Sequence, residues 1–305
     1  MSKTVLVSGA SGFIGSHVAA RLVEEGYRVR AMTRNPDGYG GAGEPVRADV
    51  SDPGSLTAAF AGVDVAYYLV HSLGSDDFEK RDAEAARNFA AAAAGAEAER
   101  IIYLGGLGAD DGELSAHLRS RRDVERILQA GPVPVTVLRA AVVIGHGGIS
   151  WEITRQLAER LPAMVTPQWV NTRTQPIALP DAVRYLTGVL EPEEARGSTY
   201  EIGGPEVLRY IDMLQRVAEI QGGHLPNVTV PLLTPRLSSA WLKFVTDVDE
   251  ETARNLVDSM SNEVVVKDDA ITRLLPGELI GYDEAVRLAL ADRESAGQHD
   301  RAGSR

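Results

Sequence analysis

The stretch that decides the fold is Val5-Leu6-Val7-Ser8-Gly9-Ala10-Ser11-Gly12-Phe13-Ile14-Gly15-Ser16-His17. Its apolar start, Thr4–Ser8, predicts a strand, and the helical pattern of Ser16–Glu25 begins directly after the three glycines. In such a turn one glycine makes the bend, one lets the backbone approach a pyrophosphate, and one lets the helix pack on the strand. The start of the helix then offers free N–H groups to the phosphates. The stretch therefore predicts a dinucleotide-binding turn, against the alternative of a purely structural glycine turn.

From this turn outward we assign a set of residues to the cofactor. They are Gly9, Ser11, Gly12, Phe13, Ile14, Gly15, Arg34, Asp49, Val50 and Leu69. Arg34 decides which cofactor we expect. The second strand ends Ala31-Met32-Thr33-Arg34-Asn35, without the acidic residue that usually binds the ribose 2′-hydroxyl of NAD. Because a guanidinium suits a 2′-phosphate, we expect NADP(H) rather than NAD(H), with a solvated loop arginine as the alternative.

Asp49 and Val50 follow a third strand, which we expect between the second strand and Ser51. They fit an adenine contact, and Asp49 fits a helix cap equally well because Ser51-Asp52-Pro53 is a helix start.

The first half of the chain alternates strand and helix patterns, as βαβ units do. Its strand segments are nearly continuous apolar runs, which is typical of a parallel sheet covered on both faces. We therefore predict an α/β fold with a doubly wound parallel Rossmann sheet and a smaller, mostly helical C-terminal lobe. The expected strands after the first are Tyr27–Thr33, Val63–Val70, Arg100–Leu104, Val133–Ile144 and Ser198–Ile202. We assign 1–148 and 175–203 to the Rossmann domain, 149–174 and 204–292 to a substrate-side lobe, and 293–305 to a mobile tail.

The overall composition argues against several classes of partner. A net charge of -12 and a pI of about 5.0 disfavour nucleic acid and anionic membrane surfaces. The chain has no cysteine, and its six histidines are scattered, so we expect no metal site. The sequence begins with a strand rather than a signal segment, and we expect a cytoplasmic protein with a small-molecule substrate. The oligomeric state stays open.

Several further motifs carry a family resemblance. They are Ala48-Asp49-Val50-Ser51-Asp52, Gly62-Val63-Asp64, Asn88, Val137-Leu138-Arg139, Gln175-Pro176-Ile177 and Tyr200-Glu201-Ile202-Gly203-Gly204-Pro205. Over about the first 220 residues the chain resembles the extended and atypical short-chain dehydrogenase/reductase superfamily. It looks most like the NAD(P)H-binding branch that includes nitrogen-metabolite regulator-like proteins and the accessory NADPH-binding subunit of respiratory complex I. The resemblance implies a Rossmann fold and a bound NAD(P)H, in a branch where some members are enzymes and others only bind the cofactor.

The chain departs from that family at its catalytic pair, a tyrosine followed four residues later by a lysine. Lysine occurs only at Lys3, Lys80, Lys243 and Lys267, and none follows a tyrosine at that spacing. By position, the resemblance places His117 and Arg121 where the pair belongs. It places Gly105 or Gly106 where the family's serine or threonine belongs.

Three residues are candidates for the chemistry. His117 is a possible proton donor. Arg121, one helical turn later, would disfavour its imidazolium form. Arg121 or Arg119 also fits as a group that polarises a carbonyl. The alternative for all of them is a charged helix face.

His71 follows the fourth strand, where open α/β sheets bind ligands, and its alternative is a loop histidine. Trp169 and Arg173 lie in the segment expected to cover the pocket, and Trp169 fits a core position as well.

Three functions follow from these residues. The first is an atypical NADP(H)-dependent oxidoreductase that acts on a small molecule by hydride transfer. The second is a non-catalytic NADP(H)-binding redox sensor or assembly protein, favoured by the missing tyrosine and lysine. The third is a nucleotide-sugar epimerase-like enzyme, which usually relies on the same missing tyrosine.

Overall fold

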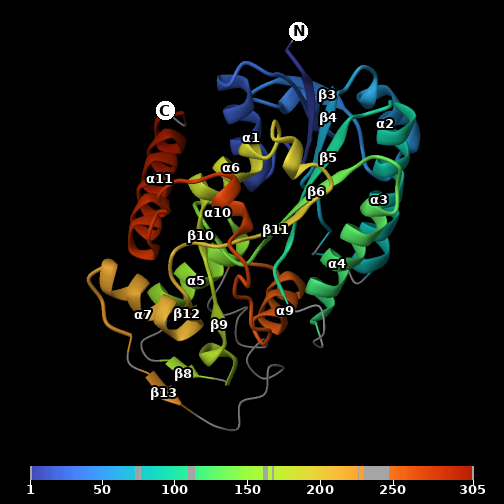
Figure 1. Ribbon diagram of the computed structural model, residues 1–305. Helices are drawn as coiled ribbons and strands as arrows, with labels where there is room; N and C mark the ends of the chain where they lie inside the picture. The colour runs from blue at the N-terminus through green and yellow to red at the C-terminus, as the bar shows by residue number, and fades with distance from the viewer. Residues whose placement is uncertain are drawn as a thin grey trace.

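A computed structural model describes residues 2–72, 74, 77–108, 114–160, 164–166, 168–225, 227–229 and 247–303. Seven parallel strands form its central sheet, in the order β11-β6-β5-β4-β1-β2-β3 (Figure 1). The strands are β1 (Thr4–Ser8), β2 (Arg28–Thr33), β3 (Glu44–Arg47), β4 (Val65–Tyr68), β5 (Arg100–Gly106), β6 (Val135–Ala140) and β11 (Thr199–Ile202). The order reverses between β1 and β4, which is where a doubly wound sheet binds its ligand. The predicted α/β Rossmann fold is confirmed.

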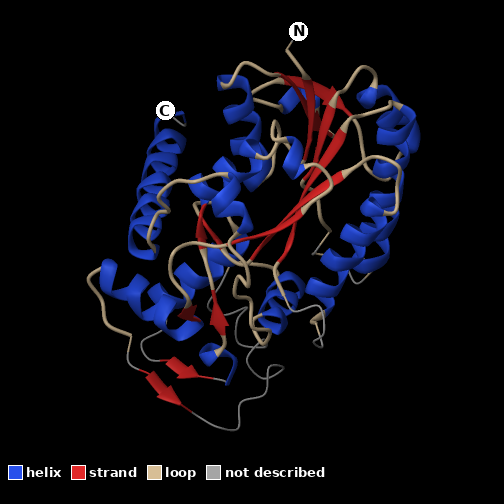
Figure 2. Cartoon of the chain, viewed as in Figure 1, coloured by secondary structure: helices blue, strands red, loops and turns tan. Residues whose placement is uncertain are grey.

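Helices cover both faces of this sheet (Figure 2). One face packs against α1 (Phe13–Glu24) and α6 (Leu179–Gly188), and the other against α2 (Pro53–Phe60), α3 (Phe78–Gly95) and α4 (Ala116–Gln129). Strand β1 shows why its sequence is apolar throughout. Val5 and Val7 belong to the core under α1 and α6, whereas Leu6 belongs to the core on the opposite face. Alternate side chains point to opposite faces, so both sets are buried.

The predicted strand Val133–Ile144 is wrong as a single element. Strand β6 ends at Ala140, and β7 (Val143–Ile144) pairs instead with β10 (Ile177–Ala178) outside the central sheet. The neighbouring strand β5 ends at Gly106, so only one further backbone bond, from Leu107 N–H to the Ala140 oxygen, extends that pairing. Beyond it the Val142 oxygen accepts from Ile177 N–H at 2.9 Å. The chain leaves the central sheet here because the next strand, β7, pairs with β10, which is not part of that sheet.

A second apolar core lies beyond the carboxyl ends of the strands, around the fully buried Trp151. Its helices are α5 (Ile149–Arg160), α7 (Tyr210–Ile220), α9 (Glu250–Ser259) and the first part of α11 (Tyr282–Gly303). The remaining short elements are η1 (Pro36–Gly38), β8 (Met164–Thr166), η2 (Gln168–Asn171), β9 (Arg173–Thr174), η3 (Glu193–Ala195), β12 (Leu208–Arg209), β13 (Asn227–Thr229) and α10 (Ala270–Leu274). The assignment of residues to two domains stays a prediction.

Helix α11 continues through Gly303, across most of the segment that the sequence predicts as a tail. A helix does not by itself exclude motion, so the mobility of 293–305 stays a prediction. Among the described residues, no helix is long and apolar enough to cross a membrane.

Candidate functional site

The glycine turn between β1 and α1 meets strict geometric demands. Gly9 has a φ of 70°, a conformation that costs other residues energy. A Cβ on Gly15 would lie 2.1 Å from the Gly9 carbonyl oxygen, so no side chain fits there. Gly12 is the N-cap of α1 and supplies no side-chain cap. The N–H groups of the first turn are therefore left for an anionic ligand.

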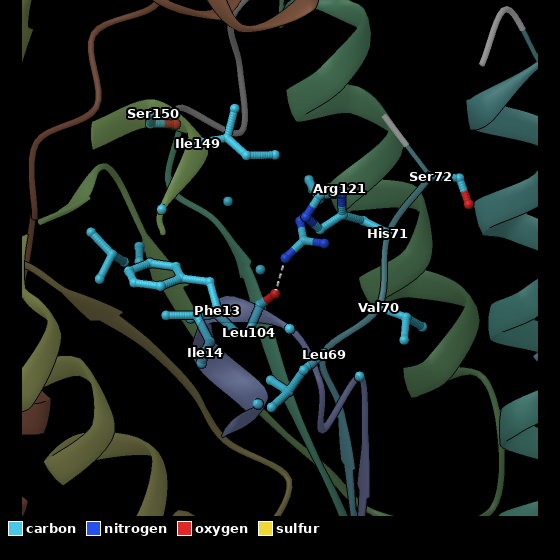
Figure 3. Close-up of a pocket in the computed structure, with 18 of the residues that line it drawn as sticks. Phe13, Ile14, Leu69, Val70, His71, Ser72, Leu104, Arg121, Ile149 and Ser150 are labelled. Atoms are coloured by element: carbon cyan, nitrogen blue, oxygen red, sulfur yellow. Dashed lines mark hydrogen bonds between the residues drawn. The ribbon is translucent and has the colours of Figure 1, made fainter. Parts of the chain in front are cut away.

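One cavity of about 670 Å³ passes this turn, a volume typical of small-molecule sites. Every residue that the sequence assigns to the cofactor lines it, and so do His71, His117 and Arg121. We call the part lined by Arg34, Asp49 and Val50 the adenine end. The part lined by His71, His117 and Arg121 is the chemistry end. Figure 3 shows His71 and Arg121 there.

Asp49 is not the helix cap at the adenine end. Its carboxylate accepts hydrogen bonds from the backbone N–H and the hydroxyl of Ser51, at 2.8 and 2.7 Å. These bonds lower the pKa of Asp49, and the nearby charges of Arg34 and Arg81 lower it further. Helix α2 is capped instead by Asp52, which accepts from Gly54 N–H at 3.0 Å. The capping alternative for Asp49 is therefore wrong.

Two arginines line the adenine end, and the sequence predicts only one of them. Arg34 and Arg81 are both exposed, and within the described chain neither guanidinium has a carboxylate partner within 4 Å. Arg81 shares one stripe of α3 with Ala85 and Asn88, and the Asn88 side chain donates to the Val50 oxygen at 3.0 Å. Arg81 was not predicted from the sequence; the i, i+4, i+7 spacing of Arg81, Ala85 and Asn88 on the expected helix was the signal available for it.

At the chemistry end two histidines are held neutral. His71 is open to the cavity, and the surrounding protein still desolvates it enough to lower its pKa to about 4. Desolvation, together with the charge of Arg121 and with His71, lowers the pKa of His117 to about 3. The Nδ1 atom of His117 is buried and has no hydrogen-bond partner among the described residues. Both rings are therefore uncharged at neutral pH, as the sequence predicts for His117.

Arg121 brings positive charge to the same end. Its Nη2 donates to the Leu104 oxygen (Figure 3), and its Cζ lies 5.2 Å from the centre of the Tyr103 ring. The Tyr103 hydroxyl donates to the Arg121 carbonyl oxygen at 3.0 Å. No carboxylate of the described chain lies within ion-pair distance of the Arg121 guanidinium. Arg119, the other candidate, is exposed and pairs with Glu79 at 3.1 Å outside the cavity.

A buried ionic cluster supports the end of β5, and the sequence alone did not reveal it. Glu125 of α4 binds Arg139 of β6 through two hydrogen bonds, of 2.6 and 3.0 Å. Arg122 lies 3.7 Å from the same carboxylate and donates to the Gly108 oxygen. An arginine within an otherwise apolar strand was the available signal, because a buried charge requires a partner. The cluster fixes the loop that forms one wall of the chemistry end.

The cavity also has an apolar lining, which we call the apolar wall. Its residues are Val142, Tyr210 and Leu256 of the second core and Leu107, Leu118 and Val264 of a small separate cluster. Arg173 is not part of it, because Arg173 is exposed and pairs with Glu263 at 2.8 Å. The side chain of Trp169 lies outside the described residues. Within the described chain no group of three His, Asp or Glu side chains is placed to hold a metal ion.

The comparisons with known proteins agree with this geometry. Residues 9–167, about half of the chain, match a family model described as NAD(P)H-binding. The ceramide reductase of Caulobacter vibrioides is 28% identical over 257 residues, which are 78% of this chain and 78% of that protein. A (4-alkanoyl-5-oxo-2,5-dihydrofuran-3-yl)methyl phosphate reductase of Streptomyces griseus is 26% identical over 230 residues, 72% of this chain and 74% of that protein.

Among solved structures, the triphenylmethane reductase of Citrobacter sp., complexed with NADP(H), superposes with a TM-score of 0.76. The match covers 94% of this chain and 99% of that one at 20% identity, so it shows the fold alone. Together these findings confirm the predicted NAD(P)H-binding family, through the family model, and the predicted Rossmann fold, through the superposition.

Proposed function

The chain belongs to the NAD(P)H-binding family, and from this premise we propose that it is an atypical NADP(H)-dependent oxidoreductase. It would transfer hydride to a small molecule without a tyrosine–lysine pair. The observation that carries the proposal is the single cavity, which joins the glycine turn to His71, His117 and Arg121. Because the cofactor supplies the hydride, the protein must chiefly position it and the substrate. The ceramide and dihydrofuranyl relatives are named as reductases, which supports the same class of reaction.

The preference for NADP(H) rests on the adenine end. Arg34 is the candidate ligand for the 2′-phosphate because its guanidinium lines the cavity and has no carboxylate partner in the described chain. Arg81 adds a second positive charge beside Asp49. Asp49 and Val50 are the candidates for the adenine, and the first turn of α1 is the candidate for the pyrophosphate.

The catalytic roles follow from charge. Arg121 stands where the family's lysine belongs and keeps a cation at the chemistry end. His117 stands where the tyrosine belongs, but a pKa of about 3 makes it a neutral imidazole at pH 7. A neutral ring orients a substrate oxygen by hydrogen bonding and is a weak proton donor. His71 lies beside them as a second neutral polar contact.

A side-by-side titration with NADPH and NADH, followed by cofactor fluorescence, tests the cofactor assignment. We expect NADPH to bind about tenfold more tightly or better, a difference of about 1.4 kcal/mol. Preference for NADH would overturn the role of Arg34 and keep the fold. Binding of neither cofactor would contradict the whole proposal. Oxidation of bound NADPH by a panel of small carbonyl compounds then tests turnover.

The second candidate is a non-catalytic NADP(H)-binding sensor or assembly protein. The observation in its favour is that no tyrosine precedes a lysine by four residues anywhere in the chain. This candidate is favoured if the protein's affinity for a partner protein differs between its NADP⁺-bound and NADPH-bound forms, while no substrate oxidises the bound NADPH. An epimerase-like activity ranks third because it usually relies on the same tyrosine.

A further inference from the structure

We propose that the substrate is an apolar conjugated carbonyl compound, an enone or a quinone, whose reduced anion is held by the guanidinium of Arg121. This inference rests on the proposed oxidoreductase function and narrows its substrate class. Three features carry it: the position of Arg121, the lack of a strong proton donor at the chemistry end of the cavity, and the apolar wall of the same cavity.

Arg121 is placed to stabilise an anion. The guanidinium lines the cavity from the second turn of α4 and lies over the ring of Tyr103. It donates to the neutral Leu104 oxygen, and no carboxylate of the described chain lies within ion-pair distance of it. The charge of Arg121 influences the buried carboxyl of Asp82, which does not line the cavity. A half-buried cation of this kind attracts negative charge that develops on a ligand. The remaining N–H groups of the guanidinium are available for that contact.

Asp82 does not line the cavity, and the groups at the chemistry end that could protonate a ligand beside Arg121 are poor acids. Strand β5 ends in Gly105 and Gly106, where no hydroxyl is present. The Tyr103 hydroxyl is buried, donates to a backbone oxygen, and has its pKa raised to about 12. The two imidazoles are neutral because desolvation and the charge of Arg121 lower their pKa values. An isolated ketone reduced here would become a strongly basic alkoxide without a matched acid to protonate it.

A conjugated acceptor removes that requirement. Hydride leaves C4 of the nicotinamide with its electron pair, forms a new bond to the electrophilic end of the acceptor, and leaves NADP⁺. The π electrons move to the carbonyl oxygen and give an enolate or a hydroquinone anion, which is a much weaker base than an alkoxide. The Arg121 guanidinium binds that oxygen, and water supplies the proton as the product leaves. Atoms and charge balance with NADPH and one solvent proton.

The apolar wall fits a flat apolar molecule. Leu118, Leu256, Val264 and Tyr210 line the same cavity as the Arg121 side chain. A mainly apolar wall with one charged group orients a conjugated ligand, because the ring packs on the wall and its oxygen turns to the guanidinium.

The test compares a naphthoquinone with the tetralone of matching ring size, with NADPH as donor and a protein-free control. We expect kcat/KM for the naphthoquinone to exceed that for the tetralone by at least about 100-fold. The solvent isotope effect on kcat should be close to unity, because no proton moves in the hydride step.

Variants at two arginines of α4 separate the role of Arg121 from folding. Arg121→Met should lower kcat/KM for the naphthoquinone by about 100-fold, and Arg121→Lys should restore part of it. Arg119→Met is the matched control, because Arg119 lies on the same helix and points outside the cavity. Thermal unfolding and the NADPH Kd are measured for each variant, so that a misfolded protein is recognised.

Each outcome decides between the hypotheses. Equal or faster tetralone reduction, or a large solvent isotope effect, would overturn the conjugated-acceptor inference and keep the oxidoreductase. An Arg121→Met variant that folds, binds NADPH and retains full activity would overturn the role of Arg121. If NADPH binds and no compound in the naphthoquinone, tetralone and wider carbonyl panel oxidises it, both this inference and the proposed function fail.

Discussion

The two ends of the cavity are built in different ways. The turn at Gly9, Gly12 and Gly15 is made of backbone from one continuous stretch, and its geometry depends on the absence of side chains. The chemistry end is made of side chains from the loop after β4, from α4 and from the second core. A site made of local backbone tolerates almost no substitution. A site made of distant side chains depends on the buried contacts that align its elements.

Of the variants proposed here, Gly15→Val should have the largest effect on stability and on NADPH binding. The added Cβ would meet the Gly9 oxygen at a distance that no packing allows, so α1 must move away from β1. We expect the free energy of unfolding to fall by about 3 kcal/mol and NADPH binding to weaken by more than about 100-fold. Urea unfolding and fluorescence titration measure these quantities. Gly297→Ala, where a Cβ meets nothing within 4 Å, is the control.

Glu125→Gln tests the dependence of the chemistry end on buried contacts. The change leaves the guanidinium of Arg139 without its bidentate carboxylate and removes a charge beside Arg122. We expect a loss of about 3 kcal/mol in the free energy of unfolding. Asp123→Asn, at an exposed ion pair on the same helix, should change it by less than about 1 kcal/mol. Equal effects of the two variants would show that the cluster does not align α4.

Arg34→Met tests the proposed contact between Arg34 and the 2′-phosphate at the adenine end. We expect the Kd for NADPH to rise about tenfold, by about 1.4 kcal/mol, while the Kd for NADH stays the same. Arg28→Met is the control, because Arg28 is an exposed arginine of β2, the strand that Arg34 follows, and does not line the cavity. A parallel weakening of both cofactors by Arg34→Met would count against a contact with the 2′-phosphate.

His117→Asn should give the smallest effect, visible in the pH dependence of stability. The folded-state pKa of His117 is lowered to about 3, below the unfolded value of about 6.5, so the unfolded chain binds the proton first. The parent therefore loses stability as pH falls from about 6.5 toward about 3, and the variant should lose less. Thermal melts at pH 7 and pH 5 measure the difference, with the exposed His224→Asn as control. Identical pH slopes in the parent and in His117→Asn would contradict the buried neutral ring.

The sequence predicts the glycine turn and the sheet well because both depend on local patterns. Continuous apolar runs such as β4 identify buried parallel strands, and the pattern of Ser51-Asp52-Pro53 identifies the start of α2. The end of β6 was not predictable, because apolar residues continue past Ala140 and the pairing stops where β5 and β11 end, at Gly106 and Ile202. Arg81 and Glu125 were missed because their importance arises from neighbours more than ten residues away along the chain.

The separate pairing of β7 with β10 has an evolutionary consequence. The central sheet satisfies its own backbone, and β7, from which the chain runs on into the second core, takes no part in it. Side chains of the second core such as Tyr210 and Leu256 can therefore be exchanged without disturbing a hydrogen bond of the seven-stranded sheet. Mutations that retune substrate choice are thereby insulated from those that govern the cofactor. A lineage carrying this scaffold can acquire new substrates by drift in one layer while the other stays under purifying selection.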